Sequence, residues 1–363
     1  MTPTDLPPAD TDAIAWIAAD TPVDVSRLGG KGAGLVRLAA AELPVPGGYI
    51  VTTAGFDTVI DDDVRAALHH DQTDDMSSAE LEAASDRLRA TVVERSAGHA
   101  VLDQVAEAYR RLGDDTAVAV RSSASGEDSA DHSFAGEHDS YLWVRGADNV
   151  CAAVRRCWAS LYTARALDYR RSAGHLPTGS MAVVVQRMVD ARTAGVFMTL
   201  NPSNGDRSKV VIEAVWGLGE PLVSGQVDPD RFVVDKVTRQ IISRHIAHKA
   251  TRAARDAKGD GVAHVDVAED RRDAPCLTDA EIAEIVDGAR RIEALTSTPQ
   301  DGEFALGDDP DDHGVQVLQT RPETVWSRRD ATPVAGGRSA MQQILHTIAG
   351  GATTSADEDD RQG

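Results

Sequence analysis

Short apolar runs alternate with helical apolar patterns along the first half of the chain, which predicts a mixed α and β protein. Continuous apolar residues at 49–51 and 117–120 predict buried strands. The pattern between them is helical from 61 to 112. Apolar residues that recur about once per helical turn predict a further long helix over 149–171.

The second half is richer in strands. Runs that alternate with polar residues, or that are apolar throughout, predict strands at 182–186, 195–199, 209–215, 231–235, 240–243, 302–306 and 314–320. Thr278 and Glu281 match a capping box, which predicts a helix from this point to Leu295. Pro322 is expected to end the last strand, because proline cannot donate a hydrogen bond to the ladder.

Composition excludes several classes of partner. The 363 residues include 58 acidic and 37 basic side chains, for a formal net charge of −21, which argues against nucleic acid or an anionic membrane as the main partner. No run of about 18 apolar residues is present to span a bilayer, and the first ten residues lack the basic and apolar regions of a secretion signal. The three cysteines are odd in number and lack metal-site spacing, so we expect reduced thiols and a cytoplasmic protein.

A glycine-rich run at 29–34 is the first candidate for ligand chemistry. It contains Lys31, the sole lysine among the first 208 residues of a chain that otherwise prefers arginine. Glycines allow close approach, the start of a helix that runs to about Ala41 presents backbone N–H groups, and an ammonium adds charge, so the run favours an anion such as phosphate. The run does not match the phosphate-loop pattern, nor clearly the dinucleotide pattern, and a flexible turn with a surface lysine is the alternative.

A second candidate begins where the strand at 117–120 delivers Arg121 into a run of small residues, 122–136. Arginine can bind phosphate through two donors, and small side chains let a loop close over a ligand. A long surface loop with incidental serines is the alternative interpretation.

Acidic and amide side chains in the second half complete the candidates. Glu213 lies at a strand end ahead of a glycine-punctuated turn at 217–225. Glu303 and Gln319 are expected on neighbouring strands, where a carboxylate and an amide oxygen can hold Mg²⁺ against phosphate oxygens. Arg321 could neutralise charge on a transferring phosphoryl group. Taken singly, each of these residues could instead form a surface salt bridge.

The order and identity of these segments resemble the N-terminal nucleotide-binding region of phosphoenolpyruvate synthase and pyruvate phosphate dikinase, which also occurs in rifampicin phosphotransferase. The matching segments are 29–35, 46–52, 120–126, 133–142, 184–189, 195–201, 211–227 and 318–324. The resemblance implies an α+β, ATP-grasp architecture in which ATP and magnesium lie between two lobes. We therefore expect a leader at 1–25, an N-terminal lobe at 26–180, a C-terminal lobe at 181–326, and a linker with an acidic disordered tail at 327–363.

The resemblance also implies a role for each candidate residue. Lys31 and Arg121 would hold the ATP phosphates and act in catalysis with Arg321, and Gly136 would lie in the loop that covers the phosphates. The residues implied to border the adenine and the nucleoside are Gln186, Met188, Val189 and Glu213.

For magnesium, the resemblance implies Glu303 and Gln319 as the ligands. This chain departs from the family there, because it has Asp301, Gly302, Glu303 and Phe304 where the family usually has Asp-Ile-Glu-Trp. The acidic turn at 308–312 also looks lengthened.

Members of this family pass phosphate from ATP to a histidine on a separate swivelling domain, and none of the eleven histidines here has the Gly-Gly setting of that residue. We therefore expect a standalone ATP-binding subunit of a phosphoenolpyruvate synthase-like, dikinase-type phosphotransferase. It would use ATP and Mg²⁺ to phosphorylate a histidine on a partner protein, with AMP as product, and a pyruvate- or phosphoenolpyruvate-binding barrel is a further expected partner. The alternatives are a nucleotide-binding regulatory module or pseudoenzyme, and the ATP-binding component of a rifampicin-type phosphotransferase.

Overall fold

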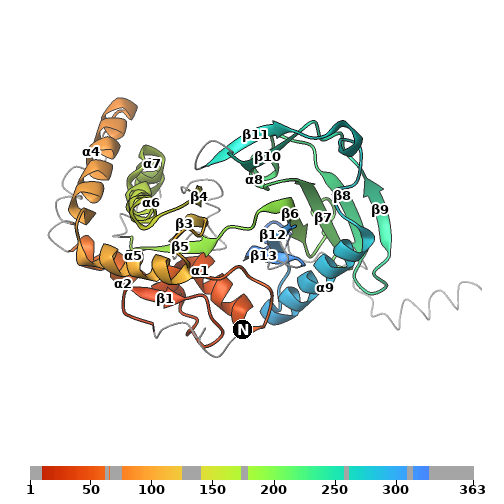
Figure 1. Cartoon of the computed structure of the whole chain (residues 1–363), viewed down its shortest axis with the longest axis horizontal. Helices are drawn as coiled ribbons and strands as arrows, with labels where there is room; N and C mark the ends of the chain where they lie inside the picture. The colour runs from red at the N-terminus through yellow and green to blue at the C-terminus, as the bar shows by residue number, and fades with distance from the viewer. Residues whose placement is uncertain are drawn as a thin grey trace, which may run out of the picture. The chain divides into compact units, whose positions relative to one another are not determined.

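The computed structural model describes residues 10–61, 65, 76–124, 140–172, 179–256, 261–308 and 314–326. These residues form a five-stranded sheet, a six-stranded sheet and a separate two-stranded hairpin, and neighbouring strands within each are antiparallel. Helices pack on the two larger sheets (Figure 1). The described residues up to Thr324 belong to one compact unit. The chain is therefore a mixed helix and sheet protein, as its sequence pattern predicts.

The first sheet draws on the first half of the chain and on one strand from beyond it. Its strands, in spatial order, are β1 (Ile14–Trp16), β2 (Gly48–Val51), β5 (Met181–Arg187), β3 (Val118–Ala124) and β4 (Ser140–Val144). β5 lies at the centre because it pairs with both β2 and β3. The sheet is therefore complete only when segments far apart in the sequence have come together.

Helices cover both faces of the first sheet. Successive side chains along β5 point to opposite faces and therefore belong to two different cores. Val184 packs against α1 (Val25–Ala40), whereas Val183 belongs to a larger core beneath the other helices. Those helices are α2 (Thr53–Val59), α4 (Ser78–Ser96), α5 (Ala100–Leu112), α6 (Ala147–Ala159) and α7 (Ala164–Ser172). Asp24 caps α1, because its carboxylate accepts a hydrogen bond from the backbone N–H of Ser26 at 2.9 Å.

The second sheet lies in the second half of the chain. Its strands, in spatial order, are β13 (Gln316–Pro322), β12 (Gln300–Gly307), β6 (Ala191–Met198), β7 (Lys209–Trp216), β8 (Asp230–Asp235) and β9 (Ile241–His245). The helix α9 (Asp279–Thr296) covers one face, where Ile285 shares a core with Phe304. Thr278 and Glu281 form the expected capping box at the start of this helix.

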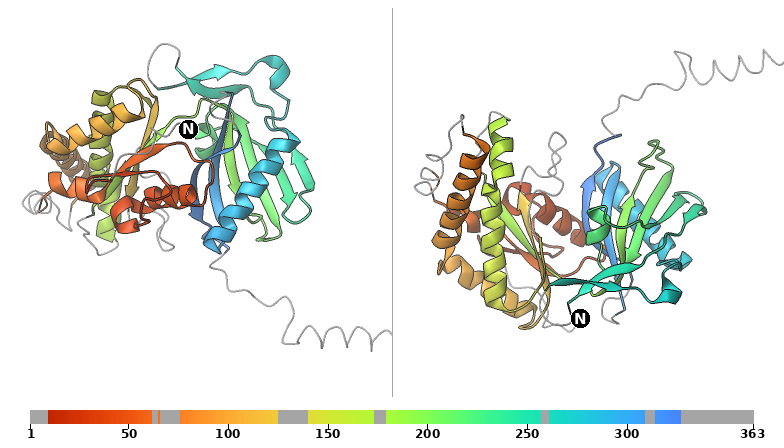
Figure 2. Two further views of the ribbon diagram at one scale, coloured as in Figure 1. Left: turned by 60° about the horizontal axis from the view of Figure 1, so that its bottom comes forward. Right: turned by 90° about the horizontal axis from the view of Figure 1, so that it is seen from above.

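The two sheets meet along α1 and along a shared apolar cluster. A Cβ built on Gly34 of α1 would lie 3.7 Å from the carbonyl oxygen of Thr320 in β13. The cluster combines residues on or near both sheets with the hairpin of β10 (Thr251–Arg255) and β11 (Val262–Asp266). Its buried members are Ala117, Trp143, Val189, Ala191, Ala194, Leu218, Ala253 and Ala305. Figure 2 shows the two sheets side by side in two further views.

Most expected elements are confirmed, with shifted boundaries. The strand expected at 117–120 continues to Ala124, so the first serines beyond Arg121 belong to β3 and not to a loop. The helix expected over 149–171 is interrupted by a 3₁₀ turn at Ser160–Tyr162. The hairpin of β10 and β11 has no counterpart among the expected strands.

Two differences concern the division into lobes. Part of the expected leader is buried strand, because residues 14–16 form β1 and pair with β2. The strand expected at 182–186 is β5 of the first sheet, so the chain passes from the first sheet to the second at 188–190. Gly136 and the expected tail at 327–363 lie outside the described residues.

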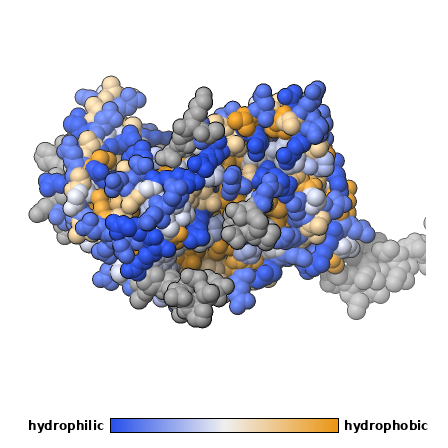
Figure 3. Space-filling view, in the orientation of Figure 1, coloured by the Kyte–Doolittle hydropathy of each residue, from blue (hydrophilic) through white to orange (hydrophobic). Residues whose placement is uncertain are grey.

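The surface is mostly hydrophilic and the cysteines are unpaired, as the composition leads us to expect. Hydrophilic residues cover most of the face shown in Figure 3. No helix in the described part of the chain is both long enough and apolar enough to cross a membrane. The three cysteines are free thiols, and burial raises the pKa of Cys151 to about 11, which keeps it protonated at neutral pH.

Candidate functional site

The glycine-rich run lies inside α1 and bends it. The backbone at Gly29 has φ 69° and ψ 174°, a conformation that breaks the helix before it resumes. A Cβ at this position would lie 2.0 Å from the carbonyl oxygen of Ser123, so both the backbone angle and the close approach to β3 require glycine. The expected glycine-rich helix start is therefore an internal restart, pressed against the end of a strand.

Lys31 follows this bend and reaches the same strand. Its Nζ donates a hydrogen bond to the backbone carbonyl of Ser122 at 3.0 Å. Arg121 is the preceding residue on β3, and only 17% of its side chain is exposed. The two cations expected at the phosphates are about 90 positions apart in the sequence, and the packing of α1 against β3 brings them together near the middle of that strand.

Arg121 also contacts the second sheet. Its Nη1 lies 3.7 Å from Oε2 of Glu303 in β12. Glu303 lies directly opposite Gln319 on β13, as the expectation of neighbouring strands requires. The phosphate candidates of the first sheet therefore face the magnesium candidates of the second.

Glu213 lies in the same transverse row of the second sheet as Glu303. Val196 of β6 is opposite Glu303 on one side and Glu213 on the other. Opposite residues on neighbouring strands project to the same face, and strands lie about 4.8 Å apart, so the Cα atoms of the two glutamates are about 10 Å apart. The adjacent residue Ile212 belongs to the core under α9, so Glu213 projects from the uncovered face. Its Oε1 lies 3.7 Å from Nε of Arg231.

Arg321 lies opposite Asp301 at the end of the same face. Arg321 Nε lies 3.7 Å from Asp301 Oδ2, and 48% of the arginine side chain is exposed. Burial raises the pKa of Asp301 above its usual value of 3.8, against the opposing effect of the Arg321 charge, and nearby Glu323 raises it further. Asp301 and Arg321 each lie two positions from the magnesium candidates, so all four side chains share one face.

The adenine candidates lie where the chain passes between the sheets. Gln186 is buried, and its Nε2 donates to the carbonyl of Pro46 at 3.3 Å. The backbone N–H of Met188 donates to the carbonyl of Ala117 at 2.9 Å. Val189 is buried in the apolar cluster shared by both sheets. The Gln186 side chain thus holds neighbouring backbone, while Met188 and Val189 form part of an apolar junction.

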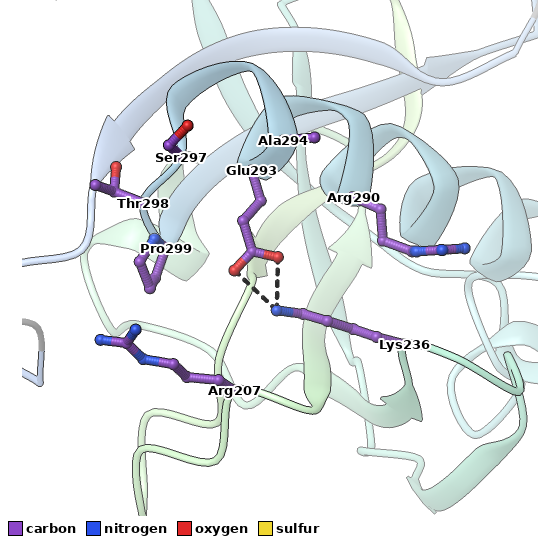
Figure 4. A pocket seen from close by; sticks show the side chains of 8 residues that line it. All are labelled: Arg207, Lys236, Arg290, Glu293, Ala294, Ser297, Thr298 and Pro299. Carbon is purple, nitrogen blue, oxygen red and sulfur yellow. Dashed lines mark hydrogen bonds and ion pairs between the residues drawn. The ribbon is translucent and has the colours of Figure 1, made fainter.

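A separate pocket of about 320 Å³ lies at the C-terminal end of α9 (Figure 4). Its lining residues are Arg207, Lys236, Arg290, Glu293, Ala294, Ser297, Thr298 and Pro299. Lys236 Nζ donates to both carboxylate oxygens of Glu293, at 2.7 and 2.9 Å. None of the expected site residues lines this pocket. The charges of Lys236 and Glu293 at its centre neutralise each other.

The described residues contain no cluster of three or more histidine, cysteine, aspartate or glutamate side chains placed to hold a metal ion. A site made from one carboxylate and one amide, such as Glu303 and Gln319, is a different kind of donor set. It suits Mg²⁺, which is held by one or two protein oxygens together with water and phosphate oxygens.

The sequence places Ser123 and Asp301 only within longer candidate segments, and it does not single out Arg231. Ser123 is assigned there to a loop, because serines after a strand are typical of a loop. Strand alternation, which places position 123 on the same face as Arg121, is the signal that could have revealed it.

Comparisons with known proteins give one family. A family model described as the pyruvate phosphate dikinase AMP/ATP-binding domain matches residues 25–340. A probable phosphoenolpyruvate synthase of Methanocaldococcus jannaschii is 38% identical over 327 residues, which cover 87% of this chain and 27% of that protein. A phosphoenolpyruvate synthase of Aeropyrum pernix is 35% identical over 350 residues, covering 87% and 43%.

A rifampicin phosphotransferase of a Streptomyces species is 39% identical over 305 residues, which cover 83% of this chain and 34% of that protein. The chain thus spans less than half the length of each of these relatives. Because the family model covers well over half of the chain, the protein belongs to the pyruvate phosphate dikinase AMP/ATP-binding domain family.

Proposed function

We propose that this chain binds ATP with Mg²⁺ between its two sheets, in an ATP-grasp arrangement, and serves as the ATP-binding subunit of a dikinase-type phosphotransferase. The observation that carries the proposal is the approach of Arg121 to Glu303, which brings the phosphate candidates and the metal candidates of different sheets to one place. Membership of an AMP/ATP-binding family supports the nucleotide.

Three cations would meet the triphosphate. Lys31 and Arg121 meet at residues 121–122 of β3, and Arg321 projects from the facing sheet. Phosphoryl transfer depends mainly on positioning and on neutralising charge in the transition state, so cations held from two sides suit this chemistry.

Glu303 and Gln319 would hold Mg²⁺ through one carboxylate and one amide oxygen. Their places opposite each other on β12 and β13 allow both oxygens to approach one ion. When bound, Mg²⁺ would supply positive charge to the phosphate oxygens.

The nucleoside would lie farther along the same face. Glu213 lies two strands from Glu303, and the Met188 and Val189 segment forms the apolar floor expected of an adenine site. We assign Gln186 to this end as well, where its side chain donates to the backbone carbonyl of Pro46. The loop that contains Gly136 would cover the phosphates.

The phosphoryl acceptor in this proposal is a histidine on a separate swivelling domain, with AMP as the nucleotide product. A pyruvate- or phosphoenolpyruvate-binding barrel would be the further partner, and the cytoplasm the location. The N-terminal lobe would extend through β5, and the C-terminal lobe would begin at β6.

The test is incubation with ATP, Mg²⁺ and a candidate histidine-domain protein, followed by chromatography of the nucleotides. Histidine-domain-dependent AMP is the expected result, and an Arg321→Ala variant that folds normally should not form it. ADP as the product would contradict the dikinase mechanism. ATP binding without any partner-dependent turnover would favour a regulatory module or pseudoenzyme.

A second candidate function is the ATP-binding part of an antibiotic phosphotransferase. The rifampicin phosphotransferase relative, at 39% identity, favours it. Rifampicin-dependent consumption of ATP in the presence of the histidine domain, with no consumption on addition of pyruvate, would distinguish this function from the synthase type.

A further inference from the structure

One buried hydroxyl bridges both sides of the bend that precedes Lys31. Ser123 Oγ accepts a hydrogen bond from the backbone N–H of Gly32 at 3.1 Å. The same oxygen donates to the backbone carbonyl of Leu28 at 3.0 Å. Ser123 is fully buried, so water does not replace either bond.

These two hydrogen bonds cap the helix where it restarts after Gly29. Because the helix breaks at Gly29, the N–H groups of the next turn have no acceptor one turn earlier. A serine at the N-cap of an ordinary helix would satisfy one of them. Here the capping oxygen comes from a different element, strand β3, which also supplies the carbonyl that accepts from Lys31.

We propose that Ser123 is a positioning residue for nucleotide binding: its hydroxyl fixes the restart of α1 and thereby holds the Lys31 ammonium at the phosphate end of the site. This inference rests on the proposed function, because it assigns to Lys31 the role of a phosphate ligand. Ser123 itself need not touch the nucleotide, since its hydroxyl is already engaged on both sides.

Loss of the Ser123 hydroxyl should lower the affinity only for ligands that carry phosphate. Ser123→Ala should weaken binding of ATP by about tenfold, in keeping with the loss of a buried cap. Its affinity for adenosine should stay within about twofold of the wild type, because adenosine lacks the phosphates that Lys31 would bind. In a Lys31→Met background, adding Ser123→Ala should change ATP affinity by less than about twofold, because the residue acts through the lysine.

A matched control is available in α4. Ser96 is equally buried, and its Oγ accepts from Arg155 Nε at 3.1 Å and donates to the carbonyl of Val92 at 2.8 Å. Ser96→Ala therefore removes a comparable hydroxyl with comparable bonds, in the helical layer remote from the phosphate candidates. It should lower the melting temperature without changing the affinity for ATP. Ser123→Cys, which replaces the hydroxyl with a somewhat larger thiol that is a weaker donor and acceptor, serves if Ser123→Ala does not fold.

The experiment combines ATP and adenosine titrations with amide hydrogen exchange on the nucleotide-free protein. Faster exchange at residues 30–34 in Ser123→Ala, but not in Ser96→Ala, is expected, together with the phosphate-dependent loss of affinity. Unchanged exchange at 30–34, equal losses for ATP and adenosine, or an undiminished loss in the Lys31→Met background would overturn the inference. A wild-type protein that binds no ATP would instead overturn the proposed function, and the exchange result would still decide whether Ser123 fixes the bend.

Discussion

Arg121 and Glu303 belong to different sheets, and their charged groups approach to 3.7 Å. The distance is an ion-pair separation, too long for a direct hydrogen bond. Arg121 lies midway along β3, and β12 presents Glu303 opposite Gln319, so this contact marks the place where the proposed phosphate site meets the proposed metal site.

Replacement of Arg121 by methionine should weaken ATP binding by about 10- to 100-fold, because a charge-assisted bond to phosphate is lost. Calorimetric titration with Mg-ATP measures this change. Arg110→Met is the matched control, since Arg110 forms an exposed helical ion pair with Glu107 and should leave the affinity unchanged. Equal affinities for the wild type and Arg121→Met would contradict the assignment.

Glu303→Gln should separate metal binding from nucleotide binding. The variant should require a higher Mg²⁺ concentration for half-maximal turnover, by about tenfold or more, because a neutral amide is a weaker magnesium ligand than a carboxylate. In the presence of EDTA it should bind ATP at least as tightly as the wild type, since a negative charge near the phosphates has been removed. Weaker binding of metal-free ATP would argue against Glu303 as a metal ligand.

The raised pKa of Asp301 predicts a defined dependence of stability on pH. Because burial disfavours the charged carboxylate in the folded protein, the free energy of unfolding should fall as pH rises from 3.8 to the raised folded value, and the penalty should stay constant above it. Asp301→Asn carries no such charge, so its stability relative to the wild type should increase across this window. Urea unfolding of both proteins from pH 3.5 to 7 measures the difference. A difference that is independent of pH, or that decreases with pH, would contradict the burial argument.

Ser122→Ala should be neutral or stabilising, by up to about 1 kcal/mol, because the buried Ser122 hydroxyl has no hydrogen-bond partner among the described residues. The backbone carbonyl that accepts from Lys31 remains in the variant. Ser160→Ala is the comparison, since the buried Ser160 Oγ donates to the carbonyl of Cys157 at 2.7 Å, and its loss should destabilise the protein by about 1 kcal/mol. Thermal unfolding of the three proteins tests the order, and a lower melting temperature for Ser122→Ala than for Ser160→Ala would reverse it.

Local sequence patterns predict the hairpin that carries Glu303 and Gln319, because two apolar runs joined by a short acidic turn favour antiparallel neighbours. They also predict the capping box of α9. They do not predict that β5 lies between β2 and β3, since pairing between distant strands leaves no mark on the periodicity of any one strand.

Two other parts of the fold could not be predicted from the sequence because their residues are mostly polar. β10 and β11 carry mostly exposed or half-buried side chains, so no apolar run marks them. Ser122 and Ser123 extend β3 although serine is typical of loops, because pairing with Val183 and Ala182 in β5 overrides the local preference. The link between Ser123 and the bend at Gly29 is likewise a tertiary contact, and it appears only when α1 and β3 are side by side.

The proposed site holds one nucleotide and one metal ion between the two sheets. A crystal structure with a non-hydrolysable ATP analogue and Mn²⁺, located by its anomalous signal, provides the sharpest test. We expect an Mn²⁺ peak at about 2.0–2.3 Å from oxygens of both Glu303 and Gln319, with the triphosphate against Lys31 and Arg121. A peak at another place, such as the pocket around Glu293, or an analogue bound to one sheet only, would contradict it.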